Sequence, residues 1–134
     1  MVIESGGITV DIQQQLGVLK RSENGWTKEL NLVAWNGKAS KYDIREWSPD
    51  HTRMTRGVVM TDEEAFNLFL ALLKEFDDSF RVCSECGQIM FDGFVINGGD
   101  EYYCSEQCLH KHYTEEEYLE MYSDDGDTYY TQWY

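Results

Sequence analysis

Four cysteines are the residues whose spacing most clearly indicates chemistry. Cys83 and Cys86 form a C-x2-C pair, Cys104 and Cys108 form a C-x3-C pair, and seventeen residues separate the pairs. Two such pairs, brought together by a hairpin, can supply the four thiolates of a tetrahedral zinc site. Cysteines of a cytosolic chain bind metal more often than they form disulfides. The spacing therefore predicts one Zn²⁺ bound by Cys83, Cys86, Cys104 and Cys108.

Two alternatives stay open for these cysteines. His110 and His112 lie close to Cys108 in the sequence, so a site of three cysteines and one histidine is the alternative ligand set. Buried or redox-active thiols without metal are the other alternative. Four thiolates leave zinc no open position for a substrate, so we expect a structural site.

Cations and aromatic rings near the middle of the chain indicate a second kind of chemistry. In the run KYDIREW, residues 41–47, alternate side chains of a strand share one face. We expect one face to be solvated and the other, with Tyr42 and Ile44, to reach the core. The solvated face would hold Lys41, Asp43, Arg45 and Trp47. Single-stranded nucleic acid binds to such a surface, because cations contact its phosphates and rings stack on its bases.

Neighbouring segments extend this candidate surface. Trp35 has the opposite parity to Trp26 and Lys28, so it joins their face only if its strand bulges or ends before it. The candidate nucleic-acid-binding residues are Trp26, Lys28, Trp35, Lys38, Lys41, Arg45, Trp47, Arg53 and Arg56. The alternative is that the tryptophans belong to a hydrophobic core and the arginines are simply solvated.

The elements that must position these residues are strands followed by a helix. Strands are expected over residues 8–22, 26–35, 41–47 and 56–60. Asn24-Gly25 and Asn36-Gly37 are strong signals for tight turns, and Pro49 breaks the third strand.

A helix is expected over residues 62–76. Thr61 and Glu64 form a capping box before it. Its apolar stripe consists of Ala65, Phe66, Phe69, Leu72, Leu73 and Phe76. Apolar residues also lie on its other faces, so we expect its own sheet to cover one side and a second copy of the chain to cover the other. The alternative is that the C-terminal part of the chain covers it.

The C-terminal part is expected to contain a hairpin between the cysteine pairs and a helix over residues 115–122, which a second capping box of Thr114 and Glu117 opens. The expected domains are residues 1–77 for nucleic-acid binding and dimerisation, residues 80–122 for the finger and its closing helix, and residues 123–134 as an acidic, aromatic tail.

The negative charge is concentrated in this C-terminal part. The formal net charge is −14. Residues 1–76 hold nine Lys/Arg and eleven Asp/Glu, whereas residues 77–134 hold two Lys/Arg and fourteen Asp/Glu. Phosphates would repel the second segment, so a structural or protein-contacting role is expected there. The alternative function is an acidic interaction module, or a nucleic-acid mimic that inhibits a host factor. The run DDGDTYY could in that case cover a basic face.

Other functional classes have little support in the sequence. No apolar run is long enough to span a membrane, and the first residues do not read as a signal peptide, so we expect a cytoplasmic protein. No phosphate-binding loop, nucleophile elbow or metalloprotease helix is present, so we expect no enzyme activity.

Residues 8–76 resemble the positive-cofactor-four family of transcriptional coactivators, in the bacterial and phage branch that includes the YdbC proteins. The resemblance rests on the run GWTKELNLVAWNGKASKYDIREWSPDHTRMTRGVVMTDEEAFNLFLALL. Its densest part is KYDIREWSPD, which a basic loop, RGVVMT and a helix with an acidic start follow.

The resemblance implies a fold, an assembly and a ligand. The family has four antiparallel strands and a helix, pairs two copies through the helices, and binds single-stranded or unwound DNA along the curved sheets. By position, Arg45 corresponds to a DNA-contacting arginine, and Trp47 lies on or beside an aromatic position. Basic positions of the family lie near Lys38, Lys41, Arg53 and Arg56. Basic residues are sparser here than in the eukaryotic coactivators, so we expect a modest affinity that depends strongly on salt.

The cysteine unit resembles treble-clef or FCS/MYM-type zinc fingers, in which YCS and a later cysteine open the closing helix. The expected fold class is α+β: a four-stranded antiparallel sheet plus a helix (ββββα), followed by a small zinc-binding finger with a helix. The expected protein is a homodimer, paired through residues 62–76, that binds single-stranded DNA, with RNA left open. A role in transcription, replication or recombination of a bacterium or phage is expected.

Overall fold

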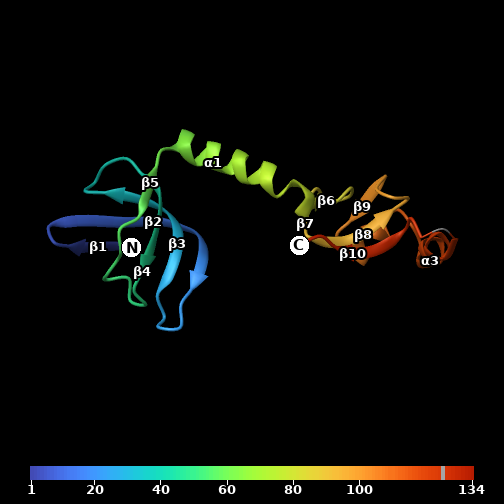
Figure 1. Ribbon diagram of the computed structural model, residues 1–134, viewed down its shortest axis with the longest axis horizontal. Helices are drawn as coiled ribbons and strands as arrows, with labels where there is room; N and C mark the ends of the chain where they lie inside the picture. Colours follow the sequence, from blue (N-terminus) through green and yellow to red (C-terminus); the bar gives the residue numbers. More distant parts are fainter. Residues whose placement is uncertain (125) are drawn as a thin grey trace. The chain divides into compact units, whose positions relative to one another are not determined.

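The protein consists of two compact units in a computed structural model that describes residues 1–124 and 126–134 (Figure 1). The first unit is Met1–Ala71 and the second is Leu72–Tyr134. The boundary falls inside the helix α1 (Asp62–Glu75). The mixed α+β class expected from the sequence is confirmed.

An antiparallel sheet forms most of the first unit, in the order β1-β2-β3-β4-β5 (Figure 1). Its strands are β1 (Val2–Ser5), β2 (Ile8–Arg21), β3 (Thr27–Trp35), β4 (Lys41–Trp47) and β5 (Val58–Met60). Each strand pairs with the next one along the chain. The last four correspond to the strands expected from the sequence, whereas β1 was not expected.

The turns have the chemistry that their residues predicted. Asn36 and Gly37 both have positive φ angles, 51° and 72°, as a tight hairpin turn requires. The Asn36 side chain also accepts a hydrogen bond from the backbone N–H of Thr9 at 2.9 Å. This turn therefore ties β2 to the β3–β4 connection and helps to fix the register of the sheet.

Strand β2 is irregular. Its register against β3 shifts between Ile12 and Gln14, between Gln15 and Gly17, and between Val18 and Lys20. At each shift β2 advances by two residues while β3 advances by one, so Gln13, Leu16 and Leu19 are the extra residues of β-bulges. Bulges bend a strand and increase its twist, so β2 can curve around the sheet.

Helix α1 begins with the expected capping box. The Thr61 N–H donates to Glu64 Oε1 at 2.9 Å, and the Glu64 N–H donates to Thr61 Oγ1 at 3.2 Å. The Tyr42 hydroxyl donates to Asp62 at 3.2 Å, which ties the first turn to the sheet. The expectation that the sheet covers one side of the helix is wrong, because none of the helix residues is buried.

The second unit contains two small antiparallel sheets and short helices (Figure 1). One sheet is the hairpin of β6 (Arg81–Val82) and β7 (Ile89–Met90), which follows a 3-10 turn over Asp77–Ser79. The other sheet has the order β10-β8-β9 and contains β8 (Asp92–Ile96), β9 (Glu101–Tyr103) and β10 (Tyr129–Gln132). The helices are α2 (Glu106–Leu109) and α3 (Glu115–Asp124).

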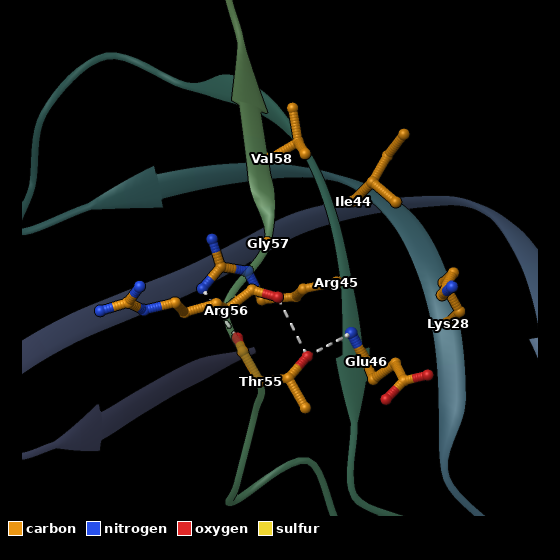
Figure 2. A pocket seen from close by; sticks show the side chains of 8 residues that line it. All are labelled: Lys28, Ile44, Arg45, Glu46, Thr55, Arg56, Gly57 and Val58. Atoms are coloured by element: carbon orange, nitrogen blue, oxygen red, sulfur yellow. Dashed lines mark hydrogen bonds between the residues drawn. The ribbon is translucent and has the colours of Figure 1, made fainter.

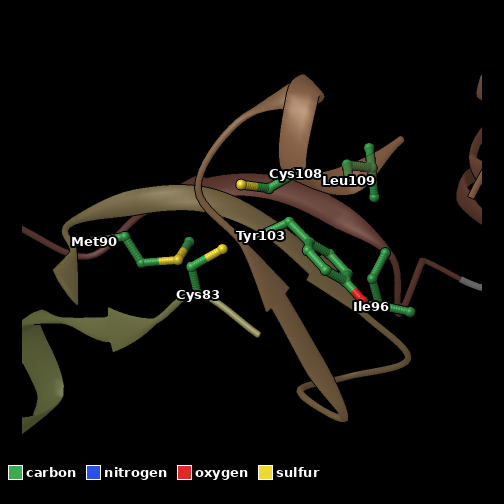
Figure 3. Packing of buried hydrophobic residues seen from close by; sticks show 6 residues of the cluster. All are labelled: Cys83, Met90, Ile96, Tyr103, Cys108 and Leu109. Carbon is green, nitrogen blue, oxygen red and sulfur yellow. The ribbon is translucent and has the colours of Figure 1, made fainter. Parts of the chain in front are cut away.

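Thiols take part in the core of the second unit (Figure 3). The buried cluster consists of Cys83, Met90, Ile96, Tyr103, Cys108 and Leu109. At Gly93, an added Cβ would lie 2.0 Å from Met90 Cε and 2.6 Å from the Tyr103 carbonyl oxygen. Only glycine therefore lets β8 pass so close to this cluster.

The end of the chain is part of this unit's structure. We expected an acidic tail over residues 123–134, but Tyr129–Gln132 form β10, which pairs with β8. Thr128 is buried, and Trp133 packs against the thiol-containing core. Asp125, part of the predicted run DDGDTYY, lies outside the described residues.

Candidate nucleic-acid interface and candidate metal centre

The face of β4 that we expected to be solvated is the interior face. Asp43 and Trp47 are 0% exposed, and the Arg45 side chain is 10% exposed. Trp47 packs with Val10 and Val33 in the core of the first unit. The predicted alternation of side chains is correct, but the prediction that Arg45 and Trp47 lie on an open face is wrong.

A paired charge makes this burial possible. Arg45 donates to Asp43 through Nη2 at 2.5 Å and through Nε at 2.7 Å, a two-pronged contact between guanidinium and carboxylate. The guanidinium also lies 4.5 Å from the centre of the Trp35 ring. Burial of Asp43 would be costly without a cation beside it, and Arg45 supplies that cation. Much of the Arg45 charge is therefore used inside the protein.

Glu29 is a second buried carboxylate on the same face. It is held by hydrogen bonds from the Thr27 hydroxyl and from Asn31 Nδ2, the latter at 3.1 Å, and lies 2.8 Å from His51 Nε2. Burial by itself raises the pKa of Glu29, but the hydrogen bonds from Thr27, Asn31 and His51 outweigh it and lower the pKa. Glu29 is therefore an interior anion that requires its partners.

The segment after β4 closes over Trp47. The His51 ring stacks on the Trp47 ring with 5.6 Å between the ring centres, and His51 has a positive φ of 59°. Asp50 accepts hydrogen bonds from the hydroxyls of Thr52 and Ser48. The hydrogen bonds from Thr52 are the main reason that the pKa of Asp50 is lowered to about 2. This compact turn explains why Trp47 presents no surface to solvent.

Cations gather instead at a hollow between β4 and the segment before β5. The hollow has a volume of about 460 Å³ and is lined by Lys28, Ile44, Arg45, Glu46, Thr55, Arg56, Gly57 and Val58 (Figure 2). Figure 2 shows the Arg45 and Arg56 side chains extending in the same direction, with Lys28 across β4 from them. Lys28 and Arg56 form no ion pair within the described part of the chain and outnumber the single lining carboxylate, Glu46, so the hollow suits a phosphate group.

Gly57 allows this hollow to form. A Cβ at this position would lie 2.3 Å from the Ile44 carbonyl oxygen and 2.6 Å from Arg45 Cβ. Gly57 and Thr55 were not predicted from the sequence as lining residues. Glu29 and His51 were not predicted on the interior face either.

The other predicted residues are distributed as follows. Trp26 is half-buried, with the guanidinium of exposed Arg53 5.6 Å from its ring centre. Lys38 and Lys41 are exposed but do not line the hollow. Trp35 is half-buried, and its indole N–H has no hydrogen-bond partner within the described part of the chain.

The four cysteines come together in the second unit. Their sulfur atoms all lie within 4.8 Å of one another. Two of the separations are 3.6 Å, between Cys86 and Cys104, and 3.7 Å, between Cys104 and Cys108. Four sulfurs at about 2.3 Å from a tetrahedral zinc are about 3.8 Å apart, so the donor set fits this metal.

Local structure places the thiols. Gly87, with a φ of 74°, closes the turn after Cys86, and its N–H donates to the Cys83 carbonyl at 3.0 Å. Ser105 begins α2, and its hydroxyl accepts a hydrogen bond from the Cys108 N–H at 3.2 Å. The first pair thus comes from a turn and the second from the start of a helix, as the spacing predicted.

The thiols differ in their electrostatics. Burial alone would raise the pKa of Cys83, but backbone N–H groups of Cys86, Cys104 and Glu85 outweigh it and lower the pKa to about 6. Burial and the neighbouring thiols raise the pKa of Cys104 to about 12. Neighbouring thiols do not readily ionise together, because the resulting thiolates repel one another. A cation at the centre of the cluster offsets this repulsion.

The two histidines have other partners. His112 Nε2 lies 2.7 Å from Glu85 Oε2, and His110 Nδ1 lies 3.0 Å from the Tyr113 carbonyl oxygen. Among the described residues, the metal-binding group contains only the four cysteines. The geometry therefore favours the four-cysteine set over three cysteines and one histidine.

A comparison with protein families matches part of the first unit. A family model described as "Transcriptional Coactivator p15 (PC4)" matches residues 22–69, which include β3, β4, the hollow and the start of α1. An uncharacterized protein of Treponema pallidum (strain Nichols) is 42% identical over 66 residues, which are 46% of this chain and 78% of that protein. In the described part of the chain, no helix is long and apolar enough to cross a membrane.

Proposed function

The chain belongs to the Transcriptional Coactivator p15 (PC4) family, and from this premise we propose that its first unit binds single-stranded nucleic acid without catalysing a reaction. The observation that carries the proposal is the cationic hollow, whose lining residues all lie within the matched segment. Proteins bind single-stranded nucleic acid by contacting its phosphates with cations and stacking aromatic rings on its bases. The cations and rings must therefore be exposed on the protein surface.

The proposed contacts follow the exposure of the side chains. Lys28 and Arg56 are exposed at the hollow and contact phosphates. Arg45 is paired with Asp43, so it shapes the hollow and makes a smaller contact of its own. The ring of Trp26, with Arg53 beside it, offers an aromatic surface for a base. Lys38 and Lys41 extend the basic surface from the start of β4, whereas Trp35 and Trp47 support the sheet from inside.

We further propose that two copies pair through α1. The helix exposes Phe66, Leu68, Phe69, Leu70, Leu72 and Leu73. Phe66 and Phe69 are 59% and 52% exposed, and their rings lie 6.0 Å apart, so they form part of one apolar surface. An exposed apolar surface of this kind indicates an interface. A second copy offers a surface of the same chemistry, and a dimer would present two cationic hollows to one strand.

The cysteine cluster is proposed to hold Zn²⁺ in a structural role. Cys83, Cys86, Cys104 and Cys108 would bind the metal, which would leave no open position for a substrate. The metal would cross-link the turn after β6 to the start of α2. The surface around the cysteine cluster is acidic, which suits contact with a protein. We propose this protein contact as the second part of the function.

Fluorescence anisotropy with labelled oligonucleotides tests the main proposal. We expect single-stranded DNA to bind more tightly than duplex, and the affinity to fall between about 50 mM and 200 mM salt. A matched RNA strand establishes the preferred nucleic acid. Equal binding of duplex and single strand, or no binding at low salt, would overturn the proposal. The biological setting that we propose is transcription, replication or recombination in the cytoplasm of a bacterium or of a phage-infected cell.

A rival function is an acidic interaction module that binds no nucleic acid. The fifteen Asp/Glu and three Lys/Arg of residues 72–134 favour it. The anisotropy experiment distinguishes the two functions, because an acidic interaction module would bind none of the oligonucleotides, even at low salt.

A further inference from the structure

An apolar patch covers one side of the β6–β7 hairpin in the second unit. Val82 and Ile89 are directly paired across the hairpin and are 50% and 58% exposed. Phe91 lies two residues after Ile89, on the same side, and is 53% exposed. The apolar patch is defined as Phe76, Val82, Ile89, Phe91 and Tyr134.

Ring contacts join three residues of this patch. The Tyr134 ring lies 6.1 Å from the Phe91 ring and 6.1 Å from the Phe76 ring, centre to centre. Tyr134 is 73% exposed, although it contacts both rings. Five neighbouring apolar side chains are therefore solvated together, which is unusual for a surface without a partner.

The fold of the finger does not require these side chains to be apolar. Cys83 and Met90 point into the buried cluster (Figure 3). Alternation along the chain therefore directs Val82 and Ile89 away from it, and both are exposed. Polar residues at the outward positions would leave the thiol-containing core unchanged. The apolar patch thus calls for an explanation other than the stability of the finger.

The surroundings of the apolar patch are acidic. Asp77 and Asp78 follow Phe76, and both are exposed. Of the three cations of the second unit, Lys111 lies 3.6 Å from Glu85, and Lys74 is exposed on α1, two residues before Phe76. Arg81 is on the opposite side of the hairpin between the rings of Tyr102 and Trp133, at 5.7 and 5.0 Å from their centres.

Charge decides which partner fits. Residues 72–134 hold fifteen Asp/Glu and three Lys/Arg, a net charge of −12. The unit and the phosphates of a nucleic acid would repel each other. A basic protein segment is attracted instead, and aromatic anchors at the centre of a charged rim are typical of protein interfaces.

We propose that the apolar patch is the docking surface for a basic, amphipathic protein segment whose apolar side chains lie against Ile89, Phe91 and Tyr134 while its lysines or arginines face Asp77 and Asp78. The inference rests on the proposed protein-contact role of the second unit and is independent of nucleic-acid binding. It names the surface and the chemistry of the partner.

The test uses the full chain, loaded with zinc, and three peptides. The probe is an amphipathic helical peptide of about five turns, with leucines on one face and lysines on the other. One control replaces its lysines by glutamates, and the other replaces its leucines by serines. We expect only the probe to bind well, because it alone has both features. Equal binding of the serine peptide would overturn the proposal, since charge alone would then suffice.

Two variants locate the binding surface. Ile89→Ser combined with Phe91→Ser should weaken binding of the probe by about tenfold or more, without changing the charge of the protein. Leu119→Ser, at an exposed apolar position on α3 outside the apolar patch, is the matched control and should bind like the unchanged protein. Equal losses in both variants would overturn the proposal.

A measurement on the unchanged protein covers the case in which the double variant fails to fold. Backbone amide NMR shifts on titration with the probe should change around the apolar patch and not along α3. If the probe binds but shifts change elsewhere, the docking surface is wrong while the protein-contact role remains. If no peptide binds, the protein-contact role fails as well.

Discussion

The two units differ in the kinds of polar group that they bury. The first unit buries Glu29, Asn31 and Asp43, and it exposes apolar residues along α1. The second unit builds its core from thiols, apolar residues and Tyr103, and carries its acids outside. This difference underlies two of our proposals: that a second copy of the chain covers α1, and that a metal ion binds the thiols of the second unit.

Removal of one metal ligand should have the largest effect on this comparison. In Cys83→Ser, zinc would lose a thiolate, and structural zinc sites contribute about 10–16 kcal/mol of apparent binding free energy. We expect the second unit to lose its cooperative unfolding while the first unit keeps its sheet. Thermal unfolding followed by circular dichroism, together with zinc analysis, measures this. His112→Ala is the control and should retain the metal. A Cys83→Ser protein with full zinc content would contradict the assignment.

Disruption of the helix surface should have the next largest effect. Full burial of a phenylalanine side chain is worth about 1.5–3 kcal/mol, so loss of two on each copy should shift the dimer to monomer at micromolar concentration. The variant is Phe66→Ser combined with Phe69→Ser, and light scattering measures the mass. Leu119→Ser tests whether any exposed apolar residue has the same effect. A dimer that survives the double change would show that the helix is not the interface.

Neutralising the buried carboxylate tests the polar interior of the first unit. Glu29→Gln replaces the acceptor for Thr27, Asn31 and His51 and should cost about 1–3 kcal/mol of the free energy of unfolding at pH 7. The pKa of Glu29 is lowered by folding, so its contribution is present above the unfolded pKa and is lost as the pH falls through the folded pKa. Urea unfolding at several pH values measures both effects. As the pH falls, the free energy of unfolding of the variant should decrease less steeply than that of the unchanged protein. An equal slope of this free energy against pH would mean that Glu29 is not the titrating group.

Changes at the hollow should have the smallest effect. Lys28→Ala and Arg56→Ala each remove one proposed phosphate contact, which should weaken single-strand binding severalfold and reduce the salt slope by about one. Anisotropy titrations at a series of salt concentrations measure the slope. Lys111→Ala, in the second unit, should leave the slope unchanged. Equal slopes for all three variants would remove the hollow from the interface.

Local signals in the sequence were sufficient for most of the fold. Asn36-Gly37 adopts the positive φ angles that a tight turn needs, Thr61 and Glu64 form their capping box, and the cysteine spacing predicts the cluster. The turn and the capping box depend on residues close in the chain. The cysteine cluster depends on bringing together two short cysteine pairs. Tertiary context was not required.

The orientation of β4 could not be obtained in this way. Alternation separates the two faces of a strand but does not say which face is inside, and a face with Lys41, Asp43 and Arg45 reads as solvated. The pairing of Asp43 with Arg45, two residues apart on one face, offsets the charge and permits burial. Strand β10 was missed for a different reason, since Tyr129–Gln132 depend on distant β8 for their pairing.

The bulges of β2 have a consequence for how this family can vary in length. Gln13, Leu16 and Leu19 are surplus to the ladder with β3, and regular pairing resumes after each of them. Loss of one such residue in a relative would straighten the strand at that point and leave the partners on either side in place. Single-residue gaps in this strand are therefore tolerable differences in curvature, whereas a gap in β3 or β4 would exchange the inner and outer faces of the sheet.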